Sequence, residues 1–91
     1  MSHRPSVNEI EHWLIARIAE VTATPPAAID PDRPMEAYGL TSVMAVGMSA
    51  DLEDWLGIVV EATIVWDHPT VAALAQYLAE SAGAGGTLRT T

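Results

Sequence analysis

The stretch from Tyr38 to Gly57 reads YGLTSVMAVGMSADLEDWLG and contains the most informative helix of this chain. No proline interrupts residues 42–56, and a glycine at position 57 is typical of the residue that follows the end of a helix. We therefore predict a helix of about four turns over residues 42–56. Apolar residues at spacings of three and four give this helix one stripe for the core: Ala45, Met48, Leu52 and Leu56.

The same helix has more apolar residues than one buried stripe requires. The residues beyond the stripe are first apolar and then acidic: Val43, Met44, Val46, Ala50, Asp51, Glu53 and Asp54. Such a surface fits an ordinary solvated helix face with some packing. It also fits a docking surface, in which acidic side chains speed the encounter with a basic partner and apolar side chains supply contact area.

Before this helix the sequence predicts another helix and then a long loop. Ser6-Val7-Asn8-Glu9 matches a capping box, in which the serine hydroxyl and the glutamate carboxylate satisfy backbone N–H groups. The apolar periodicity extends the predicted helix over residues 7–21. Residues 22–41 contain four prolines, which exclude a long regular element. We expect a short turn of helix at Asp30-Pro31 and apolar anchors for the loop at Ile29, Met35, Tyr38 and Leu40.

After Gly57 the sequence predicts two further helices. Residues 61–66 are long enough only for a short helix before His68-Pro69 interrupts it. Thr70 can cap a last helix over residues 71–81. The buried stripe of that helix is expected to comprise Val71, Leu74, Ala75 and Leu78, with Tyr77 beside it.

The two ends of the chain have little to bury. The glycines and threonines of residues 83–91 predict a flexible C-terminal tail or linker. We treat residues 1–5 as an N-terminal tail, which leaves a folded domain over residues 6–82.

The composition indicates a single all-α domain. A chain of 91 residues is too short for two independent cores, and abundant alanine without any phenylalanine favours closely packed helices. The net charge of −8 disfavours nucleic acid and anionic membranes as partners. The absence of cysteine excludes disulfides, thiolate metal sites and a cysteine nucleophile. The sequence has no secretory signal or membrane-spanning run, so we expect a cytoplasmic protein. We also expect it to be a monomer.

Ser42, at the first turn of the predicted helix, is the main candidate for chemistry. Thr41 or Ser42 can be a simple N-cap that accepts hydrogen bonds from free backbone amides. A small hydrolase would need a base and an oxyanion hole, yet the surrounding residues do not form a nucleophile elbow. The histidines are scattered and have no paired spacing for a triad or a metal: His3, His12 and His68. Alternatively, the amides and dipole of the helix start favour an anion, so a phosphodiester on Ser42 would be well placed.

Three segments resemble one known family. Residues 38–43, Tyr-Gly-Leu-Thr-Ser-Val, resemble the modification motif of acyl carrier proteins, commonly written G-L-D-S-L or G-L-D-S-V. Residues 52–57 (LEDWLG) resemble the end of that family's second helix, and residues 63–71 (TIVWDHPTV) resemble the junction of its third and fourth helices. The last two segments together are most similar to carrier domains of modular polyketide synthases, including those loaded by fatty acyl-AMP ligases.

The resemblance implies a four-helix bundle with a long loop between helices one and two and a short third helix. It implies a non-catalytic carrier whose Ser42 receives 4'-phosphopantetheine from coenzyme A through a phosphopantetheinyl transferase. Gly39, Leu40, Thr41 and Val43 would surround the attachment point. Thr41 departs from the aspartate that is usual in the family, which removes one negative charge and bears on the choice of transferase.

The resemblance also implies partners in polyketide or fatty acid biosynthesis that act on thioesters held by the arm. These are an acyl-loading enzyme, either an acyltransferase or an acyl-AMP ligase, and a ketosynthase with other synthase enzymes. The second-helix residues predicted for their recognition are Val43, Met44, Val46, Ala50, Asp51, Glu53 and Asp54. We assign Trp13, Trp55 and Trp66 to the scaffold. The alternative function is a helical protein-interaction module that has the acidic docking face but is never modified.

Overall fold

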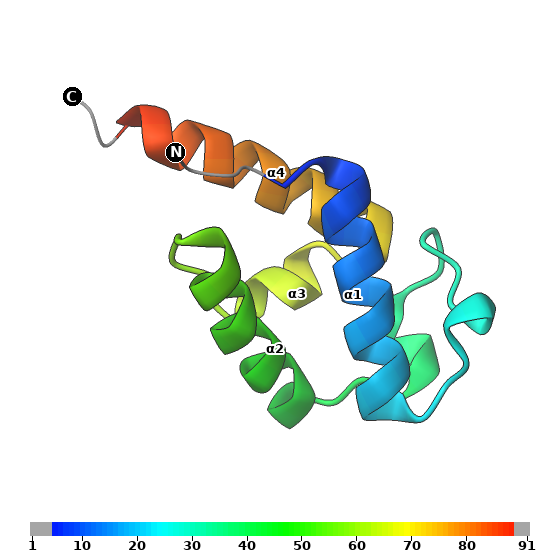
Figure 1. Cartoon of the computed structure of the whole chain (residues 1–91). Helices are drawn as coiled ribbons and strands as arrows, with labels where there is room; N and C mark the ends of the chain where they lie inside the picture. Colours follow the sequence, from blue (N-terminus) through cyan, green and yellow to red (C-terminus); the bar gives the residue numbers. More distant parts are fainter. Residues whose placement is uncertain (1–4, 89–91) are drawn as a thin grey trace.

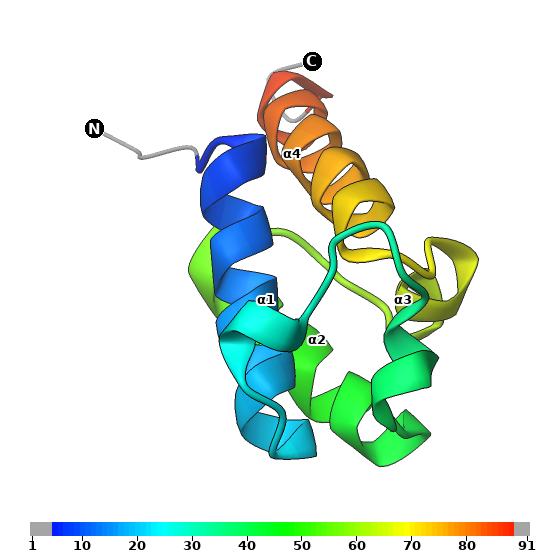
Figure 2. The same cartoon turned by 90° about the vertical axis from the view of Figure 1, so that its right-hand side faces the viewer.

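The computed structural model describes residues 5–88, and this part of the chain is all-α. Figures 1 and 2 show α1 packed against the first part of α4, with α2 and the short α3 on the other side of the core. Two 3-10 helices, η1 and η2, lie between α1 and α2. The bounds are α1 Val7–Thr22, η1 Pro26–Ala28, η2 Met35–Tyr38, α2 Ser42–Leu56, α3 Thr63–Asp67 and α4 Val71–Leu88. The predicted bundle with a long first loop and a short third helix is confirmed.

The start of α1 is fixed by the predicted capping box. The Ser6 N–H donates to Glu9 Oε1 at 2.8 Å, and the Glu9 N–H donates to Ser6 Oγ at 3.2 Å. The helix continues to Thr22, one residue beyond the prediction, and the chain then leaves it through Ala23 in the left-handed conformation (φ 55°). Pro5, assigned to the N-terminal tail, is buried, whereas residues 1–4 lie outside the described part.

The long loop is held at its apolar anchors, as predicted. Ile29, Met35 and Leu40 are buried, and Tyr38 is half-buried. Figure 2 shows the loop passing the beginning of α4, where the Met35 N–H donates to the Pro69 carbonyl oxygen at 2.7 Å. The helical turn expected at Asp30-Pro31 is wrong. The Asp30 carboxylate accepts the Asp32 N–H at 2.9 Å instead, which favours a simple turn over a helix.

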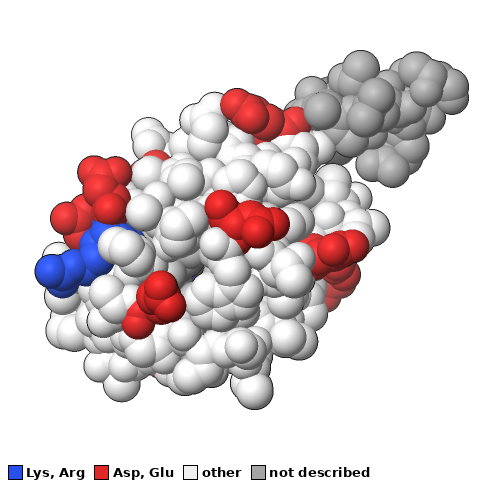
Figure 3. Space-filling view, turned by 180° about the vertical axis from the view of Figure 1, so that it is seen from behind, with Lys and Arg blue, Asp and Glu red and all other residues white. Residues whose placement is uncertain are grey.

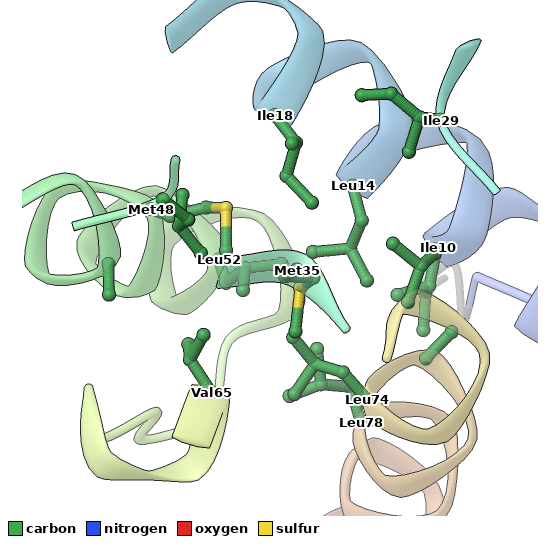
Figure 4. Close-up of a cluster of buried hydrophobic side chains, with 14 of the residues drawn as sticks. Ile10, Leu14, Ile18, Ile29, Met35, Met48, Leu52, Val65, Leu74 and Leu78 are labelled. Atoms are coloured by element: carbon green, nitrogen blue, oxygen red, sulfur yellow. The ribbon is translucent and has the colours of Figure 1, made fainter. Parts of the chain in front are cut away.

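Side chains from all four α-helices and from the long loop meet in one core (Figure 4). α2 contributes Met48 and Leu52 to it, and Val65 comes from α3. Ser49 is the one buried polar side chain among the residues described, and its hydroxyl donates to the Val46 carbonyl oxygen at 2.8 Å. Because this hydroxyl is satisfied, Ser49 is compatible with the interior.

The last helix is longer than the sequence suggests. Thr70 Oγ1 accepts the Ala73 N–H at 3.1 Å, so the predicted cap is confirmed. The helix does not end near residue 81 but continues to Leu88, and residues 83–88 are therefore helical rather than an irregular tail. Glycine in a helix interior costs only about 1 kcal/mol, and adding a residue to an existing helix needs no new nucleus. Residues 89–91 lie outside the described part, and a linker role for this end stays a prediction.

Candidate functional site

Ser42 is exposed and occupies the first position of α2. Two residues before it, Leu40 is buried, and Gly39 adopts the left-handed conformation (φ 91°) that lets the chain turn from η2 toward α2. Thr41 is the N-cap residue, and its Oγ1 accepts the Met44 N–H at 3.3 Å. Thr41 therefore caps the helix, and the neighbouring Ser42 hydroxyl remains exposed to solvent.

The surroundings of Ser42 suit a covalently attached phosphodiester. The first turn of α2 has no acidic residue, so its positive dipole end is not neutralised by a side chain. Thr41 satisfies only the Met44 N–H, and helix geometry leaves the N–H groups of Ser42 and Val43 without an intrahelical acceptor. A Cβ built on Gly39 meets nothing within 4 Å, so the space before the helix is open. The exposed Ser42 hydroxyl, the free backbone N–H groups and the open space beside Gly39 together fit a phosphodiester at this position.

The structure gives Ser42 no catalytic partner among residues 5–88. Its hydroxyl makes no hydrogen bond to His12 or to His68. The His68 ring is instead stacked on Tyr77, with 4.4 Å between the ring centroids. Within the same residues, no group of three acidic or histidine side chains could hold a metal ion.

The residues predicted for partner recognition divide into an apolar and an acidic set. In the apolar set, Val43 is 81% exposed, Val46 is 56% exposed and Ala50 is exposed, whereas Met44 is half-buried and packs on the core. The helix therefore presents an apolar surface directly beside Ser42.

Two of the three predicted acidic residues are held by contacts within the chain. Asp51 forms an ion pair with Arg17 of α1. Arg17 Nε also lies 3.4 Å from Glu20 Oε1. The Glu53 carboxylate accepts the Val60 N–H at 2.9 Å. Asp54 is exposed. On the face seen in Figure 3, acidic side chains form separate small groups rather than one continuous patch.

The sequence did not predict how the C-terminal end of α2 packs against α1. Trp13 and Trp55 are stacked, with ring centroids 5.6 Å apart and an angle of 18° between the rings. The Arg17 guanidinium lies 4.7 Å from the Trp13 ring centroid. No sequence signal links Trp13 to Trp55, because they lie on different helices, whereas Arg17 lies one turn after Trp13 on α1. Trp66, also assigned to the scaffold, is 37% exposed and is only partly packed.

Comparison with known families identifies the family to which this fold belongs. Residues 12–78 match the family described as a phosphopantetheine attachment site, and this range includes all of α2 and its N-terminal turn. The chain belongs to this family. It is a carrier domain, and 4'-phosphopantetheine is the prosthetic group that the family carries.

Individual relatives agree with this assignment. The carrier domain is 40% identical over 73 residues to one subunit of the phenolphthiocerol/phthiocerol polyketide synthase of Mycobacterium tuberculosis, covering 80% of this chain but 4% of that protein. It is 32% identical over 74 residues to the acyl carrier protein TtuC of Teredinibacter turnerae, covering 81% of this chain and 85% of that protein.

A solved structure shares the fold. It is that of a free-standing peptidyl carrier protein from Acinetobacter baumannii, with a TM-score of 0.80 and 36% identity over 84% of this chain and 95% of that one. Domains of this kind are non-catalytic carriers, and those of polyketide synthases work with the other enzymes of the synthase. Within residues 5–88, no helix combines the length and apolar character needed to cross a membrane.

Proposed function

We propose that Ser42 is the residue to which this carrier domain attaches 4'-phosphopantetheine. The observation that supports the proposal most directly is the exposed Ser42 hydroxyl at the first position of α2, beside a threonine that already caps the helix. The free amides and the uncompensated dipole end would favour the phosphodiester over a neutral hydroxyl. Ser49, the other serine of α2, is buried and its hydroxyl donates to Val46.

In the attachment reaction, this chain contributes one reacting atom, the hydroxyl oxygen of Ser42. Ser42 Oγ forms a bond to phosphorus of coenzyme A, the pyrophosphate bond breaks, and the adenine nucleotide leaves. The hydroxyl proton passes to a base on the phosphopantetheinyl transferase, because no histidine among residues 5–88 forms a hydrogen bond with Ser42. Once attached, the group supplies a terminal thiol that holds acyl groups as thioesters. These 91 residues contain no cysteine that could compete for the acyl group.

The proposed partners are the phosphopantetheinyl transferase, an acyl-loading enzyme, a ketosynthase and other synthase enzymes. The cargo would be an acyl or polyketide intermediate, in line with the synthase and acyl carrier relatives. The exposed surface of α2 would be recognised through its apolar residues and through the acidic residues toward its end. A monomeric state and a cytoplasmic location stay predictions from the sequence.

Intact-mass spectrometry tests the attachment site. The chain is incubated with coenzyme A and a broad-specificity phosphopantetheinyl transferase, and we expect one phosphopantetheinyl mass on the wild-type chain and none on Ser42→Ala. Ser49→Ala is the matched control and should gain the mass, because Ser49 is buried in the same helix. Addition to Ser42→Ala would refute the assignment of the site.

A second candidate function is an interaction module that is never modified. If a transferase that modifies a known carrier leaves the wild-type chain unchanged, this alternative is favoured. The described structure has no partner for a hydrolytic Ser42, and we expect the unmodified chain not to turn over an activated ester.

A further inference from the structure

We infer that Tyr38 is a positioning residue for the attachment reaction, because its hydroxyl closes the loop that leads to Ser42. The inference rests on the proposed attachment at Ser42. The Tyr38 ring is half-buried and packs against the core, and its hydroxyl reaches a residue eight positions back in the chain. Tyr38 Oη accepts the Asp30 N–H at 2.7 Å and lies 3.5 Å from the Asp30 carbonyl oxygen. Residues 30–38 thereby form a closed loop, which we call the Tyr38 loop.

The Tyr38 loop is attached to the start of α4 by backbone hydrogen bonds. The Ala72 N–H donates to the Pro31 carbonyl oxygen at 3.0 Å, and the Met35 N–H donates to the Pro69 carbonyl oxygen at 2.7 Å. The start of α4 is itself packed in the core, where Val71 is fully buried. The loop therefore provides a fixed base for the residues that follow it.

The residues that join Tyr38 to Ser42 make few directional contacts. Gly39 has a φ of 91° and no side chain to restrict its backbone. Leu40 is buried, but burial of an apolar side chain is not directional. Thr41 Oγ1 bonds to an N–H of α2 itself. In the described part of the chain, Tyr38 is therefore the one residue of these five whose side chain forms a hydrogen bond outside η2 and α2.

The contact between Tyr38 and Asp30 is suited to ordering the turn rather than to stabilising the whole domain. The bond lies at the surface, so water can satisfy either partner when the bond is lost, and the cost in global stability is small. Without the bond, the turn at Gly39 populates other arrangements, and the transferase binds only the fraction in which Ser42 is correctly placed. KM for the chain then rises by the inverse of that fraction, whereas kcat, which reports on the bound chain, is unchanged.

The test makes the same chemical change at the two tyrosines of the chain. Tyr38→Phe removes the hydroxyl and keeps the ring on the core. Tyr77→Phe is the matched control, because Tyr77 is also half-buried and its ring is stacked on His68. The Tyr77 hydroxyl forms no hydrogen bond to a residue within 5–88. Steady-state kinetics of modification are measured with coenzyme A and a phosphopantetheinyl transferase while the concentration of the chain is varied.

We expect Tyr38→Phe to raise KM for the chain about two- to tenfold and to leave kcat unchanged. A tenfold change corresponds to about 1.4 kcal/mol, which is near the upper limit of the net contribution of one hydrogen bond. Tyr77→Phe should leave both constants unchanged.

Amide hydrogen exchange followed by NMR gives a second readout. The Asp30 N–H should exchange faster in Tyr38→Phe, and so should the Gly39 N–H, which donates to the Glu36 carbonyl oxygen at 3.0 Å. The core amides of α1 should keep their wild-type protection. Faster exchange confined to the turn shows local loosening rather than a loss of the fold.

Three results would overturn the inference and leave the attachment at Ser42 standing. The first is wild-type kcat and KM in Tyr38→Phe, even with a lowered Tm, because a folded domain contains far less than about 1% unfolded chain and a small loss of stability does not reach KM. The second is unchanged exchange at Asp30 or at Gly39. A rise in KM would then come from direct contact of the hydroxyl with the transferase. The third is an equal effect of Tyr77→Phe, or a fall in kcat alone.

A different result tests the proposed function itself. If the wild-type chain gains no phosphopantetheinyl mass with a competent transferase, the proposed function is wrong and this inference is overturned with it. The kinetic comparison of the two tyrosines is therefore made only after intact mass has shown one addition to the wild-type chain.

Discussion

The two halves of α2 have opposite surroundings. Residues 42–50 carry no charge and expose Val43 and Val46 beside Ser42. Residues 51–56 are attached to the rest of the chain through the Asp51–Arg17 ion pair, the Trp55–Trp13 stack and the Glu53–Val60 hydrogen bond. Ala45 and Met48 bury the core side of the first half, so the difference concerns the outer side of the helix, which is tied to α1 and to Val60 at its C-terminal end and is open to partners at its N-terminal end.

The largest effect on stability is expected from the core stripe of α2. Leu52 is fully buried, so Leu52→Ala should lower the free energy of unfolding by about 2–5 kcal/mol. Val43→Ala, on the exposed side of the same helix, should change it by less than about 0.5 kcal/mol. Urea denaturation of the two variants measures the contrast. Equal losses would mean that Val43 is packed and that the two sides of the helix do not differ as described.

A smaller effect is expected from the aromatic contact at the C-terminal end of α2. A double-mutant cycle of Trp13→Ala and Trp55→Ala should give a coupling of about 0.5–1.5 kcal/mol, because the stacked rings interact beyond their buried area. The single variants should keep Ser42 open to modification at near the wild-type rate, as measured by intact mass. A zero coupling, or a large loss of modification in folded variants, would contradict the division between the two halves.

The smallest effect is expected from the ion pair. The side chains of Arg17 and Asp51 are 27% and 49% exposed, so the pair is screened by solvent. A cycle of Arg17→Met and Asp51→Asn should give a coupling of about 0.2–1 kcal/mol, and this value should fall at high salt. The cycle separates this pair from the contact of Arg17 with Glu20. A coupling that does not change with salt would point to packing of the Arg17 stem on Trp13 as the main contribution.

Local sequence signals predicted most of the helices and the position of Ser42. The capping box at Ser6, the glycine at position 57 and the proline-rich loop act over a few residues, and all three are found as expected. The extension of α4 past residue 81 was missed because glycines weaken a helix without stopping it. The turn at Asp30 was misassigned because its side chain competes for the backbone N–H groups.

The sequence by itself determined the helical bundle, the family and the candidate attachment residue, because periodicity, caps and a short motif are encoded by neighbouring residues. Only the tertiary structure decided which surface residues remain available to a partner. Asp51 pairs with Arg17, a residue 34 positions away on another helix. The open space around Gly47, where an added Cβ would meet no atom within 4 Å, depends on how the other elements pack against α2. Such contacts are fixed by the packing of helices against a common core, and no local pattern specifies them.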